Sequence, residues 1–457
     1  MTHNSALAII LAAGKGTRMK SALPKVLHRL AGASLLAHAI HAAKSAGLTR
    51  LAVVTGPDMD EVAAAATGFD PACEMFIQAE QLGTADAVKA ARQALESFDG
   101  PVLVLYGDTP LLLPATIAKI RAELEAGAGL AVVGFESDNP AGYGRLLLDA
   151  RGRLAGIREE KEASPEERAL SLCNSGIMGF RSAKILLGLL GRIANDNANG
   201  EFYLTDAVAL ARGDGLEAHI VMADAEEVLG VNSRAELGVA EALMQQRLRA
   251  SVMANGATLT APETVFLSYD TEIGSDVVIE PHVVIGPRVR IEDGARIRSF
   301  CHLESARVGQ GATVGPFARL RPGADLAKGA HVGNFVEIKQ AEIGEGAKVN
   351  HLTYIGDASV GARANVGAGT ITCNYDGFGK HRTEIGAGAF IGSNSSLVAP
   401  VKIGEGAYVG SGSVISKDVA PDSLALTRAP QEERPGWAAK TRAARGPKQK
   451  GDGNKGT

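Results

Sequence analysis

The first residues placed to do chemistry follow an apolar run near the N-terminus. Leu7–Leu11 is typical of a buried strand, and the segment after it, AGKGTRM (13–19), contains two glycines, a lysine and an arginine. Loops that leave the carboxyl end of a strand in α/β sheets commonly bind phosphate through backbone N–H groups. Lys15, Arg18 and Lys25 add cations, which predicts a phosphate-binding loop. A structural turn with solvated cations is the alternative for this loop taken alone.

Two familiar phosphate motifs are absent from this loop. A dinucleotide-binding fingerprint needs a third glycine where Met19 stands, and GKGT has neither the spacing nor the order of a Walker A loop. A second apolar run, PVLVLYGD (101–108), ends in Asp108, where α/β sheets place their ligand groups. An aspartate there often only caps a helix, but beside bound phosphate its carboxylate suits Mg²⁺.

The second half of the chain has another set of reactive side chains. They recur at comparable positions of a repeat: Arg321, Lys339, His351, Tyr354, Asn374 and Tyr375. A single surface histidine on a repeat is more often without a function, but this combination favours a second site. The segment TCNYDGFGKHRTE (372–384) breaks the repeat and should leave it as a loop, a common place for functional residues.

Two sequence periods indicate the elements that carry these residues. Residues 1–232 alternate strand-like runs with Ala-rich stretches such as ADAVKAARQAL (85–95), which predicts a doubly wound, Rossmann-like α/β domain. Residues 233–256 are predicted to form one linker helix, with Ser233 as N-cap and Glu236 completing a capping box.

Residues 257–430 have a different period, in which aliphatic residues recur every sixth position. Examples are Leu267, Ile273, Ile279 and Ile285, with glycine often following. Such hexapeptide repeats are typical of a parallel β-helix, in which each unit adds one short strand and one turn to a stacked core. Residues 431–457 are rich in Lys, Arg and Gly, which indicates a basic, flexible tail.

Composition excludes several classes of protein. The formal net charge is -4 and the body of the chain has no long basic block, which argues against nucleic acid as a partner. The four cysteines are far apart and form no C-x-x-C pair, so we expect neither a disulfide framework nor a zinc site. With no signal-peptide pattern and no long apolar stretch, we predict a cytoplasmic protein without a membrane span.

The first half resembles the sugar-1-phosphate nucleotidyltransferases. Their hallmark, L-A-A-G-x-G-T-R-M…P-K, is complete as Leu11 to Met19 with Pro24-Lys25. Other matching segments follow in the family's order: QAEQLGTADA (78–87), YGDTP (106–110), GYGR (142–145), REEK (158–161), CNSGI (173–177), EFYLTD (201–206) and GVNSR (230–234). Joined to hexapeptide repeats, this pattern is similar to the bacterial family of bifunctional N-acetylglucosamine-1-phosphate uridyltransferases/glucosamine-1-phosphate N-acetyltransferases.

For the first half, the resemblance implies uridylyl transfer from UTP to N-acetylglucosamine-1-phosphate, with release of pyrophosphate. Arg18 and Lys25 would neutralise phosphate charge, while Asp108 and Asn232 would bind Mg²⁺. The implied contacts of UDP-N-acetylglucosamine are Leu11, Ala12, Ala13, Gly14, Lys25, Gln78, Gly83, Thr84, Tyr106, Gly107, Asp108, Gly144, Glu159, Asn174 and Asn232.

For the second half, the resemblance implies acetyl transfer from acetyl-CoA to glucosamine-1-phosphate in a left-handed β-helix that assembles as a homotrimer. The substrate carries an ammonium near neutral pH, and His351 would remove its proton. The implied sugar-phosphate contacts are Arg321, Lys339, Tyr354, Asn365, Asn374 and Tyr375. The implied acetyl-CoA contacts are Ala368, Ser393, Ser411 and Arg428.

Two other functions remain to be weighed against this one. The chain could be a single-activity nucleotidyltransferase whose β-helix only assembles subunits, although such a β-helix has no need for His351, Tyr354 and the Asn374-Tyr375 loop. It could also be a non-catalytic sensor of sugar nucleotides, although such a protein has no need for Arg18, Lys25 and Asp108. The sequence therefore favours the bifunctional enzyme.

Overall fold

The computed structural model describes residues 6–197 and 199–446 and divides into two compact units. The first unit comprises residues 1–290 with 302–305, and the second comprises 291–301 with 306–457. The first unit therefore includes the predicted linker helix and the first strands of the hexapeptide region.

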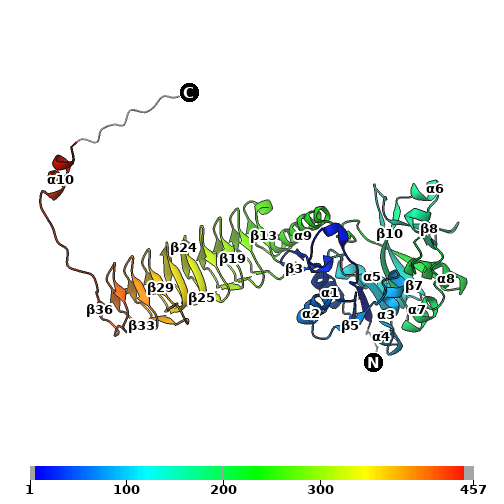
Figure 1. The fold of residues 1–457 in the computed structure, drawn as a ribbon, viewed down its shortest axis with the longest axis horizontal. Helices are drawn as coiled ribbons and strands as arrows, with labels where there is room; N and C mark the ends of the chain where they lie inside the picture. The colour runs from blue at the N-terminus through cyan, green and yellow to red at the C-terminus, as the bar shows by residue number, and fades with distance from the viewer. Residues whose placement is uncertain (1–5, 198, 447–457) are drawn as a thin grey trace, which may run out of the picture. The chain divides into compact units, whose positions relative to one another are not determined.

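A mixed nine-stranded sheet is the centre of the first unit, with its main strands in the order β11-β7-β10-β6-β1-β4-β5 (Figure 1). Strands β1, β4, β5 and β6 are parallel, β10 runs antiparallel to both β6 and β7, and β8 and β9 form an antiparallel pair beside β10. The strand bounds are β1 Leu7–Leu11, β4 Arg50–Thr55, β5 Glu74–Ile77, β6 Val102–Tyr106, β7 Leu130–Glu136, β8 Gly144–Leu148, β9 Leu154–Arg158, β10 Leu172–Phe180 and β11 Ala218–Met222.

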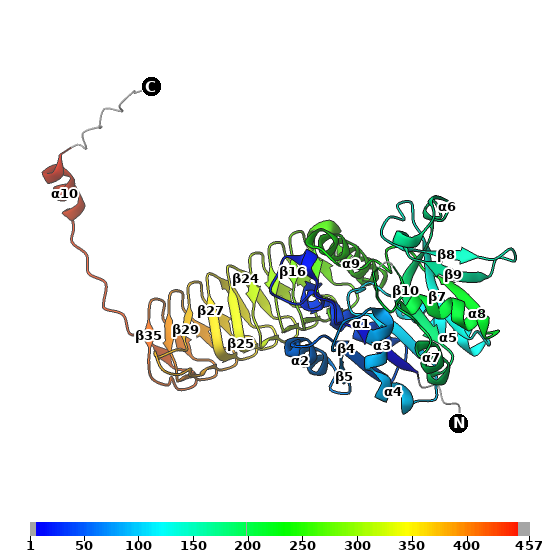
Figure 2. The same cartoon turned by 45° about the vertical axis from the view of Figure 1, so that its right-hand side comes forward.

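Helices cover both faces of this sheet (Figure 2), as predicted for a doubly wound domain. Alternate residues of β1 point to opposite faces, so Ala8 and Ile10 join one apolar core while Leu7 and Ile9 join the other. The predicted helix 85–95 is two short helices, with the break at Ala91. The helix bounds are α1 Leu35–Ser45, α2 Asp60–Phe69, α3 Thr84–Ala90, α4 Arg92–Glu96, α5 Pro114–Glu125, α6 Pro165–Arg168, α7 Ala183–Leu190 and α8 Ala207–Gly213.

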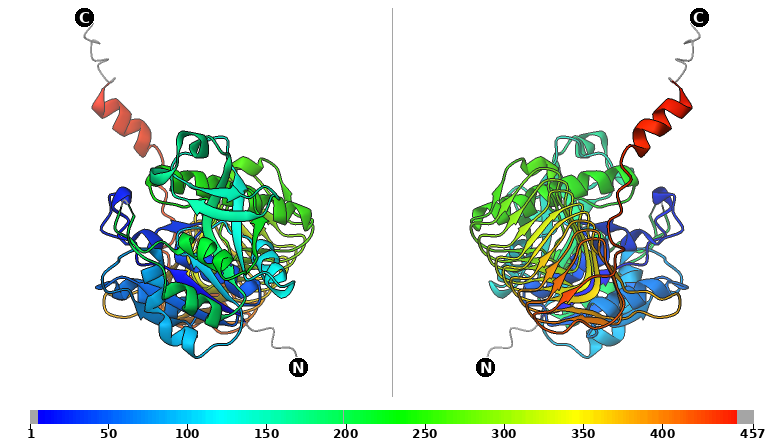
Figure 3. Two further views of the ribbon diagram at one scale, coloured as in Figure 1. Left: turned by 90° about the vertical axis from the view of Figure 1, so that its right-hand side faces the viewer. Right: turned by 90° about the vertical axis from the view of Figure 1, so that its left-hand side faces the viewer.

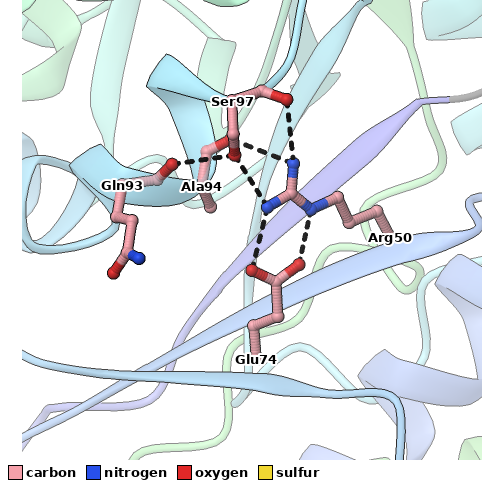
Figure 4. Close-up of polar contacts among 5 residues, drawn as sticks. All are labelled: Arg50, Glu74, Gln93, Ala94 and Ser97. Carbon is pink, nitrogen blue, oxygen red and sulfur yellow. Dashed lines mark hydrogen bonds and ion pairs between the residues drawn. The ribbon is translucent and has the colours of Figure 1, made fainter.

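Arg50 connects the last two strands of the sheet by an ion pair and holds the end of α4 by hydrogen bonds (Figure 4). The Arg50 guanidinium on β4 donates to both carboxylate oxygens of Glu74 on β5, at 2.5 and 2.9 Å, and to Ser97 Oγ at 3.0 Å. Hydrogen bonding from Arg50 lowers the pKa of Glu74. A bidentate pair of this kind fixes geometry, so the contact holds the strand edge that precedes the Gln78–Thr84 segment of the first site.

The predicted linker helix is α9, Arg234–Ala254. Ser233 Oγ accepts from the backbone N–H of Glu236 at 3.3 Å, as predicted. The capping box also predicts that the Glu236 carboxylate accepts from the backbone N–H of Ser233. This prediction is wrong, because the carboxylate accepts from the backbone N–H of Asn232 at 2.7 Å instead. Leu237, Ala240 and their helical neighbours pack against apolar residues of the first unit.

The hexapeptide region forms short parallel strands stacked in rungs, and the right panel of Figure 3 shows the coils one behind another. The hand of the coil stays a prediction. In the first unit these strands are β12 Thr258–Leu259, β13 Phe266–Leu267, β14 Glu272–Ile273, β15 Val278–Ile279, β16 Val284–Ile285 and β19 His302–Leu303, with β17 Arg290–Ile291 at the boundary.

The second unit continues this pattern with three columns of strands. The first column is β18 Arg296–Ile297, β21 Thr313–Val314, β24 His331–Asn334, β26 Lys348–His351, β28 Asn365–Val366, β31 Phe390–Ile391, β34 Tyr408–Val409 and β36 Leu424–Ala425. The others contain β20 Ala306–Val308, β22 Arg319–Leu320, β23 Ala324–Leu326, β25 Glu337–Ile343, β27 Tyr354–Val360, β29 Ile371–Cys373, β30 Thr383–Ile385, β32 Ser396–Val398, β33 Val401–Ile403 and β35 Val414–Ile415.

The aliphatic residue of each hexapeptide points into the core of the β-helix. Ile338, Val349 and Ile355 are fully buried, while Ile273 near the start of the repeat is half-buried. The predicted loop leaves the β-helix between β29 and β30. Beyond Pro430 the structure has a helix, α10 Trp437–Arg445, and residues 447–457 of the predicted tail lie outside the described residues. Every described helix is too short or too polar to cross a bilayer.

Candidate active sites

The loop after β1, predicted to bind phosphate, packs closely against Lys25. Gly16 has φ +60°, and a Cβ at this position would lie 2.5 Å from the Cβ of Lys25. A side chain is disfavoured by the left-handed backbone and blocked by this contact. Glycine therefore lets the loop approach the segment that carries the predicted catalytic lysine.

A cavity of about 520 Å³ opens beside this loop. Ten of the residues predicted to contact the sugar nucleotide line it, and they come from four segments of the chain: Leu11, Ala12, Ala13, Gly14, Lys25, Gln78, Gly83, Thr84, Tyr106 and Asp108. Gly107 lies beside it, donating its N–H to Leu11 O at 2.9 Å. Arg18 is exposed on the short helix Thr17–Met19 and is not among the lining residues.

Lys25 joins the two residues predicted to bind the metal. Its ammonium forms an ion pair with Asp108 Oδ2 and donates to Asn232 Oδ1 at 2.8 Å. Asp108 follows β6 and Asn232 precedes α9, so the fold brings together residues more than a hundred positions apart. Both oxygens therefore converge on one cation, which is the arrangement that a metal site at this point requires.

The chemistry of these donors fits Mg²⁺. The ion prefers oxygen ligands and usually takes one or two carboxylates together with phosphate oxygens and water. The described residues contain no cluster of three or more His, Cys, Asp and Glu side chains that could hold a metal. A metal at this site would thus be bound by Asp108, Asn232 and the phosphates of the nucleotide.

The other end of the site contains the predicted sugar contacts. Gly144 pairs with Asn174 between β8 and β10, and the Glu159 carboxylate lies close to Gly144. Burial and neighbouring acidic groups raise the pKa of Glu159, whose Oε1 accepts from Thr205 Oγ1 at 3.1 Å. Burial, together with Asp108 and Glu159, also raises the pKa of Tyr106. Tyr106 therefore keeps its proton between the phosphate and sugar ends.

In the second unit, the turn residues after the first column of strands form a line along the β-helix. His351 occupies this position at the end of β26, and the corresponding residues on the following rungs are Ala368, Ser393 and Ser411. Backbone bonds connect these turns, with Gly369 N donating to His351 O at 3.1 Å and Asn394 N to Ala368 O at 2.7 Å. Arg428 Nη1 donates to Ser411 O at 2.5 Å. The predicted acetyl-CoA contacts thus start one rung from His351.

The predicted sugar-phosphate contacts lie on nearby rungs. Tyr354 begins β27, three residues after His351, and pairs with Glu337. Arg321 and Lys339 occupy equivalent positions on successive rungs, and Arg321 donates to Glu337 Oε1 at 2.8 Å. Asn365 lies on β28, paired with Lys348. Four successive rungs therefore carry the whole set.

The loop contributes a cation that the sequence pattern did not single out. Lys380 lies close enough to lower the pKa of Lys339, and Arg321 lowers it further. Clustered positive charges attract an anion, so Arg321, Lys339 and Lys380 form a candidate phosphate site, although Glu337 already pairs with Arg321. Sequence could have suggested Lys380 only through its place in the loop, since it lies outside the repeat.

Hydrogen bonds within the loop give it a defined shape. Asn374 is buried and donates to the Asp357 carboxylate, and Tyr375 pairs with Lys380 across the loop. Asp376 accepts from the backbone N–H groups of Phe378 and Gly379 and contacts His381 at 2.7 Å. These bonds, the backbone ones first, hold the pKa of Asp376 well below its usual range. The loop can therefore present Tyr375 and Lys380 in fixed positions.

Comparison with known proteins matches two regions of the chain to different kinds of domain. Residues 8–169 match the MobA-like NTP transferase domain, and residues 270–304 and 382–417 match the bacterial transferase hexapeptide repeats. Bifunctional protein GlmU of Azorhizobium caulinodans is 59% identical over 446 residues, covering 98% of this chain and 99% of the relative. The chain belongs to the GlmU family. GlmU of Rhodospirillum rubrum is 59% identical over 438 residues, 95% of this chain and 97% of the relative.

Membership of the GlmU family makes this chain a bifunctional transferase with a nucleotidyltransferase domain and a hexapeptide transferase domain. The two-site prediction from sequence is thereby confirmed over the single-activity alternative. The roles of individual residues rest on their geometry and remain proposals.

Proposed function

We propose that the chain makes UDP-N-acetylglucosamine in two steps at two separate sites. One site acetylates glucosamine-1-phosphate from acetyl-CoA, and the other joins the product to the uridylyl group of UTP. The observation that carries this proposal is the line of turns from His351 through Ala368 to Ser393, on the same rungs of the β-helix as a cluster of three cations. A β-helix used only for assembly has no need of a base, an anion site and a line of small side chains together.

In acetyl transfer, the three cations hold the substrate phosphate and thereby place its ammonium near His351. The neutral imidazole takes one proton from the ammonium, which leaves a lone pair on the amine nitrogen. The amine attacks the thioester carbonyl, a C–N bond forms, and the C–S bond breaks. The departing CoA thiolate takes up a proton, while the amine nitrogen loses its second proton.

In uridylyl transfer, the loop N–H groups and Lys25 hold the triphosphate of UTP. Gly144, Glu159 and Asn174 hold the amino sugar so that its phosphate oxygen faces the α-phosphorus. That oxygen forms the new P–O bond as the bond to pyrophosphate breaks. Asp108 and Asn232 would hold Mg²⁺, which would supply charge neutralisation at the phosphates.

Two assays on the purified wild-type chain test the proposal. One measures CoA release from acetyl-CoA with glucosamine-1-phosphate, and the other measures pyrophosphate release from UTP with N-acetylglucosamine-1-phosphate and Mg²⁺. We expect both activities. Absence of CoA release would leave the β-helix with an assembly role, and absence of pyrophosphate release would remove the first site.

Replacement of the loop lysine should separate binding from chemistry in the acetyl-transfer site. Lys380→Ala removes one charge-assisted contact to phosphate, worth about 1.5–3 kcal/mol. We expect the KM for glucosamine-1-phosphate to rise on the order of 10- to 100-fold, with kcat changed little. Steady-state CoA-release kinetics would measure this.

Lys402→Ala is the matched control, because its ammonium pairs with Glu384 at 3.1 Å on another column of strands. Its KM should stay at the wild-type value. An unchanged KM in Lys380→Ala would show that the loop lysine does not contact the phosphate.

The proposed function includes a homotrimer and a cytoplasmic location. One corner of the β-helix supports assembly, because Phe300, Phe317 and Phe335 stack with ring centres 4.8 and 5.1 Å apart. Their rings are 51%, 46% and 54% exposed, and the exposed Leu352 continues the line. Contiguous exposed apolar surface of this kind marks an interface more often than scattered residues do. All four residues have positive φ.

Phe317→Asn should dissociate the trimer without straining the turn. Asparagine adopts positive φ more readily than phenylalanine, so the corner itself should be preserved. Loss of one ring per subunit removes about 1.5–3 kcal/mol of apolar burial in each copy. We expect light scattering during size-exclusion chromatography to show monomers at micromolar concentration.

The control is Phe378→Asn, which replaces a ring that is 98% exposed at the loop tip. It should leave the trimer intact. A trimeric Phe317→Asn would place the interface on another surface.

A further inference from the structure

The proposed base, His351, has a partner that the mechanism above does not use. Asn334 at the end of β24 pairs directly with His351 at the end of β26, seventeen residues later. The amide oxygen Oδ1 of Asn334 lies 2.5 Å from Nδ1 of His351. We propose that Asn334 is a positioning residue that fixes the tautomer and orientation of His351 for acetyl transfer; this rests on the function proposed above.

The chemistry of a neutral imidazole gives this contact its consequence. Only one ring nitrogen carries a proton, and the other has the lone pair that accepts a proton. When Nδ1–H donates to Asn334 Oδ1, Nε2 is the unprotonated nitrogen. Nε2 can then take the proton of the substrate ammonium, as a general base must.

An amide suits this task better than a carboxylate. Asn334 carries no charge, so it orients the ring without favouring the protonated imidazolium. A carboxylate at the same position would stabilise the imidazolium and thereby keep more of the base in its inactive form near neutral pH. The choice of asparagine therefore fits a base that must be neutral before each turnover.

The backbone holds the two side chains in register. A Cβ at Gly333 would lie 1.9 Å from the carbonyl oxygen of Asn350, so glycine lets the two rungs approach here. Leu352 N donates to Asn334 O at 3.1 Å, and Thr353 Oγ1 donates to His351 O at 2.7 Å. Both turns are thus fixed on either side of the amide–imidazole contact.

The charged groups around the pair belong to neighbouring rungs. His331 on β24 has its pKa lowered by burial first and then by Arg298, Lys348 and His351. These neighbours are cationic or, in the case of His331, favoured in the neutral form. These groups act through their charge, whereas Asn334 contacts the His351 ring directly and supplies direction.

The test compares Asn334→Ala and Asn334→Asp in the full-length chain. We expect Asn334→Ala to lower kcat for CoA release on the order of 10- to 100-fold, part of the contribution of a positioned base, with the KM for glucosamine-1-phosphate within about twofold. Asn334→Asp keeps an acceptor for Nδ1–H, so it should retain more activity than Asn334→Ala. Its acid limb in the profile of kcat against pH should move about one pH unit higher.

Two controls separate positioning from folding. Ser299→Ala changes the same turn position two rungs away and should leave the acetyl-transfer kinetics at wild-type values. Thermal unfolding of every variant, followed by circular dichroism, reports whether the β-helix remains folded.

Three outcomes would overturn the inference: wild-type kcat in Asn334→Ala, an unmoved acid limb in Asn334→Asp, or a loss in Asn334→Ala confined to KM. The last would make Asn334 a substrate contact. Failure of the proposed function itself looks different, because the wild-type chain would then release no CoA.

Discussion

Asp108→Ala should abolish pyrophosphate release and leave CoA release unchanged. Two side-chain oxygens contact the Lys25 ammonium, one from Asp108 and one from Asn232, and only the Asp108 carboxylate is charged. Metal binding at the phosphates is worth several kcal/mol of charge stabilisation, so its loss corresponds to about a 10³-fold fall in rate or more. Substitution also leaves Lys25 without its ion-pair partner, which weakens the positioning of the triphosphate.

Asp108→Asn tests the charge while keeping the shape. The amide preserves a hydrogen-bond acceptor for Lys25 but binds Mg²⁺ more weakly, so we expect a large loss that excess Mg²⁺ restores in part. Treating the wild-type chain with a chelator should stop pyrophosphate release, and added Mg²⁺ should restore it. Asp138→Ala, at an exposed position of the same domain, is the matched control. Full uridylyl transfer by Asp108→Ala would contradict the assignment.

The architecture could be predicted because each half has a strong period. Apolar runs bounded by glycine gave the parallel strands β1, β4 and β6. The six-residue spacing identified the β-helix and its inward residues, because a stack of identical rungs repeats the same environment. The hand of the coil could not be inferred, since spacing is the same in either hand.

Helix breaks and capping hydrogen bonds were harder to predict than the repeating strands. The helix expected at 85–95 breaks at Ala91, where no glycine or proline gives a signal. The capping box failed in one half because Glu236 reaches Asn232 rather than Ser233. The same bond fixes the backbone of a proposed metal ligand, so the departure from the common pattern supports the site.

Residues that meet only through the fold were missed. Asn334 and His351 are one rung apart, but the repeat slips by one residue between them, and a fixed spacing of eighteen would not pair them. Lys380 lies on a loop outside the repeat, so no periodicity relates it to Lys339. For Arg18 the sequence predicted more than the structure shows. The motif assigned it a catalytic role, but its side chain is exposed and does not line the cavity.

His351→Ala should remove acetyl transfer and leave uridylyl transfer intact. A positioned general base contributes about 10²–10⁴-fold, and alanine removes the imidazole that would act as that base. The substrate phosphate would still meet Arg321, Lys339 and Lys380, so the KM for glucosamine-1-phosphate should change little. A lower kcat for CoA release with an unchanged KM for glucosamine-1-phosphate would therefore show that His351 transfers the proton and does not bind the sugar.

The pH dependence separates this role from a structural one. Without an internal base, the variant depends on the small fraction of substrate that is already a free amine. That fraction rises about tenfold per pH unit below the pKa of the amine, so residual CoA release should climb steadily with pH. The wild-type rate should instead level off once His351 is neutral. A His351→Ala variant that kept wild-type kcat and levelled off in the same way would assign the proton transfer to another group. The first site forms its own cavity around Lys25 and Asp108, so pyrophosphate release by the same preparation shows that the first unit is intact. An unchanged melting temperature of the variant would show that the β-helix is folded as well.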